Sequence, residues 1–577
     1  MFENFSLQTN RSIELIFRNW TRRKRHYDFV GNIEEEENCY RPQDYNENIT
    51  DACQFVKTTP SCSGVVSLIN YLYIFECILH WDASLLWGLP AMTLAVFILL
   101  LYAISLYVNA RYFLLPNSIA LAKYLNIPSY DFGCLVLGIL FTLPCALCMI
   151  FACFEYNRSD SLLHAMTFGK IFTCWVMGLG LLSYRGGFRF KGRIFLRDML
   201  FLTLGWVYLY AAVFNEMLNE NQEEYLKAEP TIHIHAYISI VIYMLYIICR
   251  VFSLRRYFRK PNIVEEVDIL STSIESIESD SYPDLLYNEI DLSVQPWQQF
   301  WNCINPMKAL GSHSILSKIL LSPFYILLAL LIPVVNPERH LAGWCKAISC
   351  GSCLIFPLLL FTLDLDSYTM FSLLILGISV TLLIIFLTHS QRIPTNHELL
   401  SLWGLVMGFM LFNIVDLEIC CILWQFLNYF FDMDNDDILI LAFPFSYVFV
   451  EGIFVVTLME NDYREMALGF VMGSVLFIAY SALPVMLFSV CFGTNHVYSL
   501  TDNTTTAFYF MAIVECVTIF GFSLSGYELR PSFSVFLGTV AFIFALFMIL
   551  ENEQVIHAYG TMHSRTVFVD VMHNQWA

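Results

Sequence analysis

Residues 90–108 read PAMTLAVFILLLYAISLYV, an apolar run without a single charged side chain. A helix needs about 20 mainly apolar residues to cross the hydrocarbon core of a bilayer, so this run predicts a membrane span. Comparable runs recur along the 577-residue chain, of which 57% is hydrophobic and 14% charged. Soluble domains carry roughly a quarter charged residues. The composition therefore predicts an all-α polytopic membrane protein and excludes a soluble enzyme, while the net charge of −19 argues against a nucleic-acid partner.

The apolar runs predict about thirteen spans in two groups, separated by an acidic, Ser-rich break. The first group lies at 90–108, 131–153, 165–184, 198–217 and 233–253. The second lies at 318–335, 348–363, 367–388, 400–430, 437–459, 466–490, 507–526 and 531–550. We expect this order of regions: a non-cytosolic, Cys-bearing segment 1–85, a first membrane half 86–253, a cytosolic linker 254–317, a second membrane half 318–556 and a tail 557–577.

The orientation follows from basic residues in short loops, which mark the cytoplasmic side of a membrane. The loop after the third span carries such residues: Arg185, Arg189, Lys191, Arg193 and Arg197. This loop and the linker are predicted to face the cytoplasm or the matrix. The N-terminus and the glycosylation sequon at Asn157 are predicted to lie on the opposite side of the membrane. A further sequon at Asn503 fits if the runs 348–363 and 367–388 make only one crossing between them.

Four cysteines in or next to the polar N-terminal segment differ from the others, most of which lie in apolar runs. They are Cys39, Cys53, Cys62 and Cys77, and a sequon at Asn48 lies between the first two. In a non-cytosolic compartment, thiols in such a segment form disulfides. We expect at least one disulfide among the four, which would anchor this segment to the first span.

Several short motifs occur in an order that is typical of one transporter family. They are the N-terminal stretch Cys53–Lys57 with Cys62 and Leu68–Leu72, the segment Ala110–Pro116 with Arg111 at an acidic position of the family, the FLRD sequence Phe195–Asp198, the IPVV sequence Ile332–Val335, Tyr463 with Met466, Ala467 and Gly473, and Tyr559–His563. Together they resemble the mitochondrial-type sodium/calcium exchangers, the cation/calcium exchanger branch of the calcium/cation antiporters.

This resemblance implies two inverted repeats, at 110–184 and 400–490, and cation antiport by alternating access. The transported ions would be Ca²⁺ and Na⁺ (or H⁺), no cofactor would be bound, the partners would be lipid and inorganic cations, and the chain would not be an enzyme. A transport-inactive pseudo-exchanger with a binding or regulatory role is the alternative. Oligomeric state stays open, as does the choice between a plasma or secretory-pathway membrane and the mitochondrial inner membrane.

The resemblance also places the family's ion ligands, and most of these positions have lost their oxygens. These positions are Phe141, Cys145 and Ile478, and a fourth position, Tyr447, keeps only a distant hydroxyl. Only Glu451 keeps a carboxylate, and Thr173 still fits the partner helix of the first repeat. Because Ca²⁺ takes 6 to 8 oxygen ligands, calcium binding would require further acids.

Other charged residues within the spans are candidates for that role. Glu418 fits an acidic position of the family, and Asp416 lies two residues earlier, on nearly the opposite side of a helix. Glu515 lies near the middle of the span 507–526. Lys170, one turn into the third span, is expected to extend its ammonium group to the membrane interface.

Overall fold

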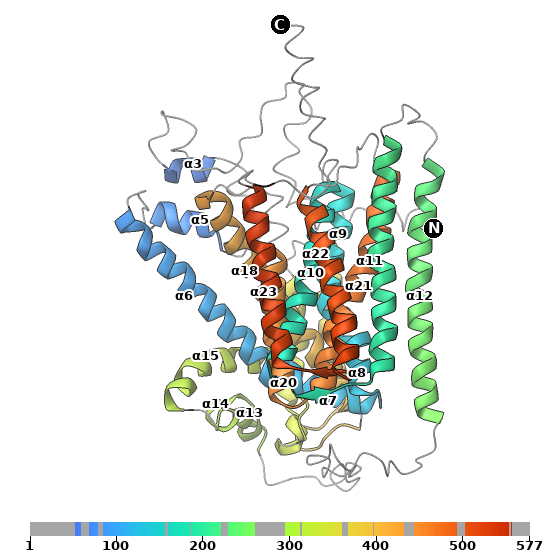
Figure 1. The fold of residues 1–577 in the computed structure, drawn as a ribbon. Helices are drawn as coiled ribbons and strands as arrows, with labels where there is room; N and C mark the ends of the chain where they lie inside the picture. The colour runs from blue at the N-terminus through green and yellow to red at the C-terminus, as the bar shows by residue number, and fades with distance from the viewer. Residues whose placement is uncertain are drawn as a thin grey trace, which may run out of the picture. The chain divides into compact units, whose positions relative to one another are not determined.

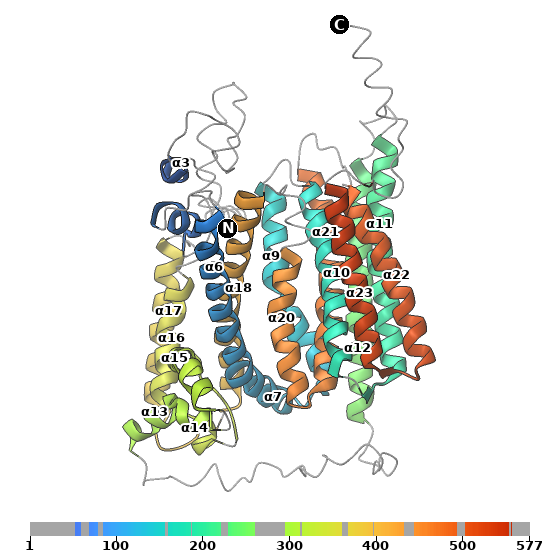
Figure 2. The ribbon, with the colours of Figure 1, turned by 60° about the vertical axis from the view of Figure 1, so that its left-hand side comes forward.

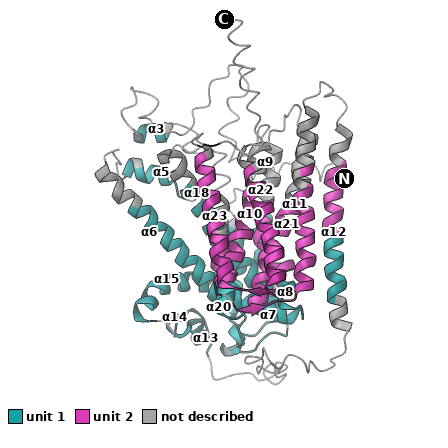
Figure 3. Cartoon of the chain, in the orientation of Figure 1, with its two compact units in different colours: residues 1–132, 245–425, 456–462 teal, residues 133–244, 426–455, 463–577 magenta. Residues whose placement is uncertain are grey.

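The protein divides into two compact units, which are drawn in different colours in Figure 3. Unit 1 comprises residues 1–132, 245–425 and 456–462, and unit 2 comprises residues 133–244, 426–455 and 463–577. The computed structural model describes residues 52–58, 69–78, 85–155, 160–185, 187–220, 229–259, 295–311, 314–337, 339–360, 367–395, 397–431, 443–492, 502–552 and 556.

The described part of unit 1 consists of helices (Figure 1). They are α3 (Ala52–Thr58), α5 (Tyr71–Tyr73), η1 (Ile74–Ile78), α6 (Leu85–Asn109), η2 (Ala110–Leu114), α7 (Leu115–Tyr124), α8 (Ser129–Phe132), α13 (Pro296–Ile304), α14 (Pro306–Ala309), α15 (Ile315–Leu331), η4 (His340–Gly343), α16 (Lys346–Leu360) and α17 (Ser367–Leu387). Within this unit α16 packs along α17, as Figure 2 shows from the side, and α15 packs on α6.

Unit 2 contains a second helical bundle and one short antiparallel strand pair, β1–β2. Its elements are η3 (Gly133–Leu137), α9 (Gly138–Glu155), α10 (Asp160–Arg185), β1 (Phe188–Arg189), α11 (Gly192–Glu220), α21 (Arg464–Phe492), α22 (Asp502–Leu524), β2 (Glu528–Leu529) and α23 (Pro531–Asn552). Helix α21 packs against α9, α10 and α11, and α10 also packs against α22 and α23. Three helices contain residues of both units: α12 (Glu229–Arg259), α18 (Leu399–Phe431) and α20 (Phe443–Glu460).

Within the described residues, every predicted span overlaps a helix, which confirms the all-α polytopic fold. Among the described residues, seven helices are long and apolar enough to cross a membrane, and α15, α16 and α17 contribute shorter apolar segments. The predicted number of about thirteen crossings stays a prediction. At about 1.5 Å per residue, the 15 residues of α16 span less than the bilayer core.

The first predicted span ends too early. The structure continues α6 through the π-helical turn η2 into α7, so that the apolar helix runs to Tyr124. Pro116 does not break it: the proline lies where the π-helical turn η2 passes into α7, and the backbone just before it keeps right-handed helical angles.

The sequence motif Ile332–Val335 ends α15 and forms an extended segment that Asn117 of α7 fixes in place. The Asn117 amide donates to the carbonyl of Pro333 at 3.0 Å and accepts from the N–H of Val335 at 2.9 Å. Because Asn117 is fully buried, these bonds satisfy backbone groups that helix hydrogen bonding leaves open. A polar side chain within an apolar helix thus has a structural role here.

In the N-terminal segment, a disulfide joins Cys53 of α3 to Cys77 of η1, with a Cα–Cα distance of 4.8 Å. It ties two short helices that precede α6. Cys39 and Cys62 lie outside the described residues, as do the sequons at Asn48 and Asn157.

Candidate functional site

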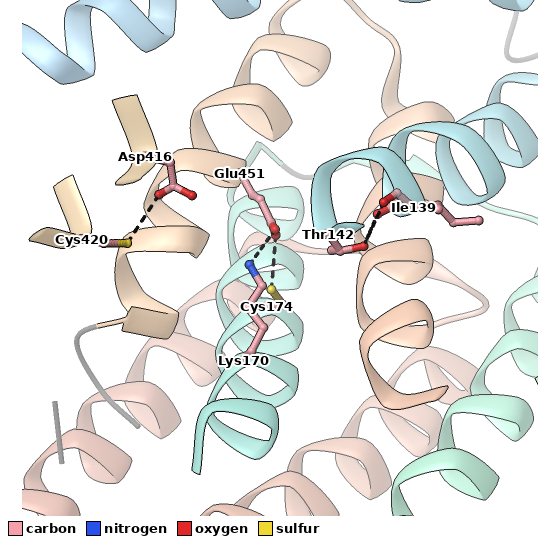
Figure 4. Close-up of polar contacts among 8 residues, drawn as sticks. Ile139, Thr142, Lys170, Cys174, Asp416, Cys420 and Glu451 are labelled. Carbon is pink, nitrogen blue, oxygen red and sulfur yellow. Dashed lines mark hydrogen bonds and ion pairs between the residues drawn. The ribbon is translucent and has the colours of Figure 1, made fainter. Parts of the chain in front are cut away.

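The central feature of unit 2 is a buried ion pair between Lys170 of α10 and Glu451 of α20 (Figure 4). The Lys170 Nζ lies 2.7 Å from Glu451 Oε1, and the two side chains are 1% and 10% exposed. Cys174, one helical turn after Lys170, donates its thiol to Glu451 Oε2 at 3.3 Å. Residues four apart share one face of a helix, so α10 presents an ammonium and a thiol to the same carboxylate.

This arrangement occupies both oxygens of Glu451, the carboxylate that the resemblance places at an ion-ligand position. One oxygen accepts from an ammonium and the other from a thiol. A buried carboxylate is costly unless it is paired and hydrogen-bonded. In this structure the chain itself supplies the positive charge at Glu451.

The prediction that Lys170 extends to the membrane interface is therefore wrong. Lys170 is among the largest fully buried side chains of the described residues. Its partner lies 281 residues away in sequence, so no pattern within its own helix reveals the pairing.

An aromatic cluster lies next to the ion pair. Phe141 of α9, one of the ligand positions that the resemblance implies, stacks on Phe454 of α20 with ring centroids 4.9 Å apart. Phe470 of α21 meets Phe141 edge-on at 5.0 Å. Since Phe454 follows Glu451 by three residues, the cluster packs one turn from the carboxylate. The cluster therefore offers aromatic carbon, and no oxygen ligand, at Phe141.

The other positions from the resemblance offer little more to a hard cation. Cys145 of α9 is fully buried and close enough to interact electrostatically with Lys170. Ile478 of α21 is also fully buried, and Thr173 of α10 is half-buried. Tyr447 lies on α20, with its side chain outside the described part. Helices α9 and α10 of the first predicted repeat, and α20 and α21 of the second, contribute residues to unit 2.

The other acids that the sequence offers as candidate ion ligands have partners of their own. Glu515 of α22 accepts hydrogen bonds from Thr203 and Trp206 of α11. In unit 1, Glu418 of α18 accepts from the hydroxyl of Tyr71 at 2.6 Å. Asp416, also of α18, faces the thiol of Cys420 at 3.9 Å (Figure 4). Among the residues with described positions, no three His, Cys, Asp or Glu side chains form a group that could hold a metal ion.

Arg111, at a position where the family has an acid, forms its own ion pair in unit 1. Its guanidinium lies 2.9 Å from Glu460 and also donates to the Tyr107 hydroxyl. Both partners are more than a quarter exposed, so the pair adds about 0–1 kcal/mol of stability at most. The guanidinium of Arg111 thus has its charge partner within unit 1.

We expect Tyr71→Phe to destabilise the protein by about 1–3 kcal/mol. The substitution removes the donor to Glu418, and a buried acceptor without its donor loses about that much free energy. Thermal unfolding in detergent measures the effect. Tyr73→Phe on the same short helix is the control, because Tyr73 is exposed. Equal melting temperatures for the two variants would contradict a structural role for the Tyr71–Glu418 bond.

Comparison with known proteins supports the family resemblance. The mitochondrial sodium/calcium exchanger protein of Mus musculus is 24% identical over 461 residues, covering 74% of this chain and 75% of the relative. The proteins of the same name from Homo sapiens and Gallus gallus are 24% and 22% identical, and cover 75% and 76% of their own lengths. No family model and no solved structure matches. The chain is an integral membrane protein and a distant relative of the mitochondrial sodium/calcium exchangers.

Proposed function

We propose that this chain is a membrane cation antiporter of the exchanger type that moves singly charged cations, Na⁺ against H⁺, in place of Ca²⁺. The observation that carries the proposal is the Lys170–Glu451 ion pair. The named activity of the relatives supports exchange as the general class. Among the membranes considered, the relatives' names favour the mitochondrial inner membrane.

Charge balance explains the preference for a singly charged ion. In the paired state, one carboxylate and one ammonium sum to zero. If a cation such as Na⁺ takes the place of the ammonium and Lys170 releases its proton to water, the site again sums to zero. A Ca²⁺ ion beside a single carboxylate leaves an uncompensated positive charge in a low-dielectric environment, which costs several kcal/mol.

The same charge balance describes an exchange cycle. A cation that binds Glu451 on one side of the membrane removes the charge partner of the Lys170 ammonium, so that the lysine gives up a proton. On the other side, a proton taken up by Lys170 restores the pair and expels the cation. Each cycle moves one cation against one proton, and no net charge crosses the membrane.

The transport-inactive alternative is favoured by the aromatic cluster. Phe141, Phe454 and Phe470 pack against one another where a passage for ions would need polar groups. In that case the ion pair would be an architectural replacement for a bound cation, and the protein would act by binding a partner.

Flux measurements on the full chain in liposomes distinguish these functions. We expect a Na⁺ gradient to drive proton movement, no Ca²⁺ uptake, and a loss of flux in Glu451→Gln to the level of protein-free liposomes. Cys145→Ala serves as the control and should retain the flux, because a thiol is a poor ligand for hard cations.

Two results would count against the proposal. Robust Ca²⁺ flux that survives Glu451→Gln would mean that ions pass elsewhere. No flux with any ion in the wild type, together with Ca²⁺ flux in the double variant Phe141→Asn, Cys145→Asp, would establish the transport-inactive alternative.

A further inference from the structure

Two cysteines of unit 1 that are far apart in sequence meet at the start of a helix. Cys303 lies near the end of α13, and Cys345 directly precedes α16. Their thiols hydrogen-bond to one another. Both belong to a small apolar cluster with Ile304 and Ile348, and both are present as free thiols.

The environment of the two thiols is asymmetric. The Cys345 sulfur accepts from the Cys303 thiol and from the backbone N–H groups of Ala347 and Ile348, in the first turn of α16. These donors lower the pKa of Cys345 although burial opposes them, since N–H groups at a helix start favour a negative charge. For Cys303, the bond to Cys345 and burial raise the pKa. Cys345 is thus the better nucleophile of the two.

A small cavity adjoins both sulfur-bearing side chains. Its lining includes Cys303, Cys345, Arg339 and Gly343. Arg339 adds a positive charge close to Cys303 and hydrogen-bonds the Tyr325 hydroxyl. A cavity next to a thiolate, with a guanidinium in its wall, gives a small polar oxidant a place to react.

We propose that Cys345 and Cys303 form a peroxide-oxidisable modification site, with Cys345 as the attacking and Cys303 as the resolving residue. The Cys345 thiolate attacks one oxygen of hydrogen peroxide, the O–O bond breaks, and Cys345 becomes a sulfenic acid while hydroxide leaves and takes up a proton as water. The Cys303 sulfur then attacks the Cys345 sulfur. The S–O bond breaks, the S–S bond forms, and the hydroxide leaves as water with the Cys303 proton. Overall, two thiols lose two electrons to one peroxide.

The expected consequence is a covalent link between α13 and the turn before α16. Noncovalent contacts already dock these parts, because Gln299 of α13 donates to the carbonyl of Trp344. In that turn Leu341, Ala342 and Gly343 all have positive φ, and the carbonyl of Val334 leaves no room for a side chain at Gly343. The disulfide would tie α13, in the predicted cytosolic linker, to the second membrane half.

The test uses the full chain purified in detergent, treated with increasing hydrogen peroxide, alkylated, digested and analysed by mass spectrometry. We expect a crosslinked peptide containing Cys303 and Cys345 at peroxide concentrations at least tenfold below those that oxidise Cys249 or Cys350. With Cys303→Ser, a dimedone adduct should appear on Cys345. In the Cys345→Ser variant, Cys303 should give at least tenfold less dimedone adduct than Cys345 gives in the Cys303→Ser variant.

Two outcomes would overturn the proposal. One is that both thiols remain fully alkylatable at peroxide concentrations that oxidise Cys249, a result that needs no variant and so does not depend on how variants fold. The other is equal adduct formation on Cys303 and Cys345 in the two serine variants, which would remove the assigned roles. Neither readout involves ion flux, so failure here is separate from failure of the proposed function.

Discussion

Lys170→Met is expected to destabilise the folded protein by about 3–5 kcal/mol, the cost of leaving one member of a buried ion pair without its partner. Methionine keeps an unbranched chain that fits the space of the lysine stem, so the variant removes charge more than volume. Glu451 is left with the thiol of Cys174 as its donor in the cluster. Reversible unfolding in detergent, followed by tryptophan fluorescence, measures the change in free energy.

The double variant Lys170→Met, Glu451→Gln is the matched control. Removing both charges together should recover most of the lost stability, because replacing a buried pair by neutral groups is often close to neutral. A double-mutant cycle then gives the coupling energy between the two side chains. Simple additivity of the two single variants would mean that the ammonium and the carboxylate do not interact, and would contradict the ion pair.

The single variant also links stability to ion binding. Without the ammonium, Glu451 is open to an external cation, and a cation that binds only the folded state stabilises it by about 2.7 kcal/mol at 100 times its dissociation constant. We expect Na⁺ to raise the melting temperature of Lys170→Met and to have little effect on the wild type. An equal effect of Na⁺ on both proteins would show that Lys170 does not compete with cations.

The sequence predicted the spans well because length and apolarity are local properties that the bilayer requires. Each run of about 20 apolar residues became a helix, since a backbone in lipid must satisfy its hydrogen bonds within the segment. The exception at Asn109–Pro116 has a local cause. The predicted span stops at residue 108, before Arg111 and Pro116, but the turn η2 carries the helix through this stretch.

The candidate site could be predicted only in part. The resemblance placed Glu451 at a ligand position. In the structure Glu451 is buried in unit 2, which also contains several of the other ligand positions that the resemblance implies. The role of Lys170 was not predictable, because burial of a lysine depends on an acid contributed by a distant helix. The same holds for Glu418, whose partner Tyr71 lies 347 residues away in sequence. Local patterns identify which charged residues lie within spans, but not how they pair.

A close crossing in unit 2, between η3 and α21, depends on glycine. A Cβ atom at Gly473 of α21 would lie 2.2 Å from the Cys134 carbonyl oxygen and 2.7 Å from the Cys134 Cα. In return, a Cβ atom at Gly138 would lie 2.7 Å from backbone of Gly473. All of these atoms belong to the backbone, so no side-chain rotation relieves the overlap. Small residues allow such close contact between membrane helices, where packing and not water drives association.

Gly473→Ala is therefore expected to prevent normal folding, although alanine is the better helix former. Alanine gains about 1 kcal/mol in helix propensity over glycine. Overpacking a core typically costs about 1–3 kcal/mol, and the cost here is larger because separating α21 from η3 disrupts contacts along the whole crossing. Gly538→Ala on α23 is the matched control, because nothing lies within 4 Å of its Cβ position. Size-exclusion recovery and melting temperature should fall sharply for the first variant and stay level or rise for the second. If alanine were tolerated equally at both positions, α21 would have to pack farther from Cys134 than the structure places it, and Phe470 on the same helix would no longer meet Phe141 beside the ion pair.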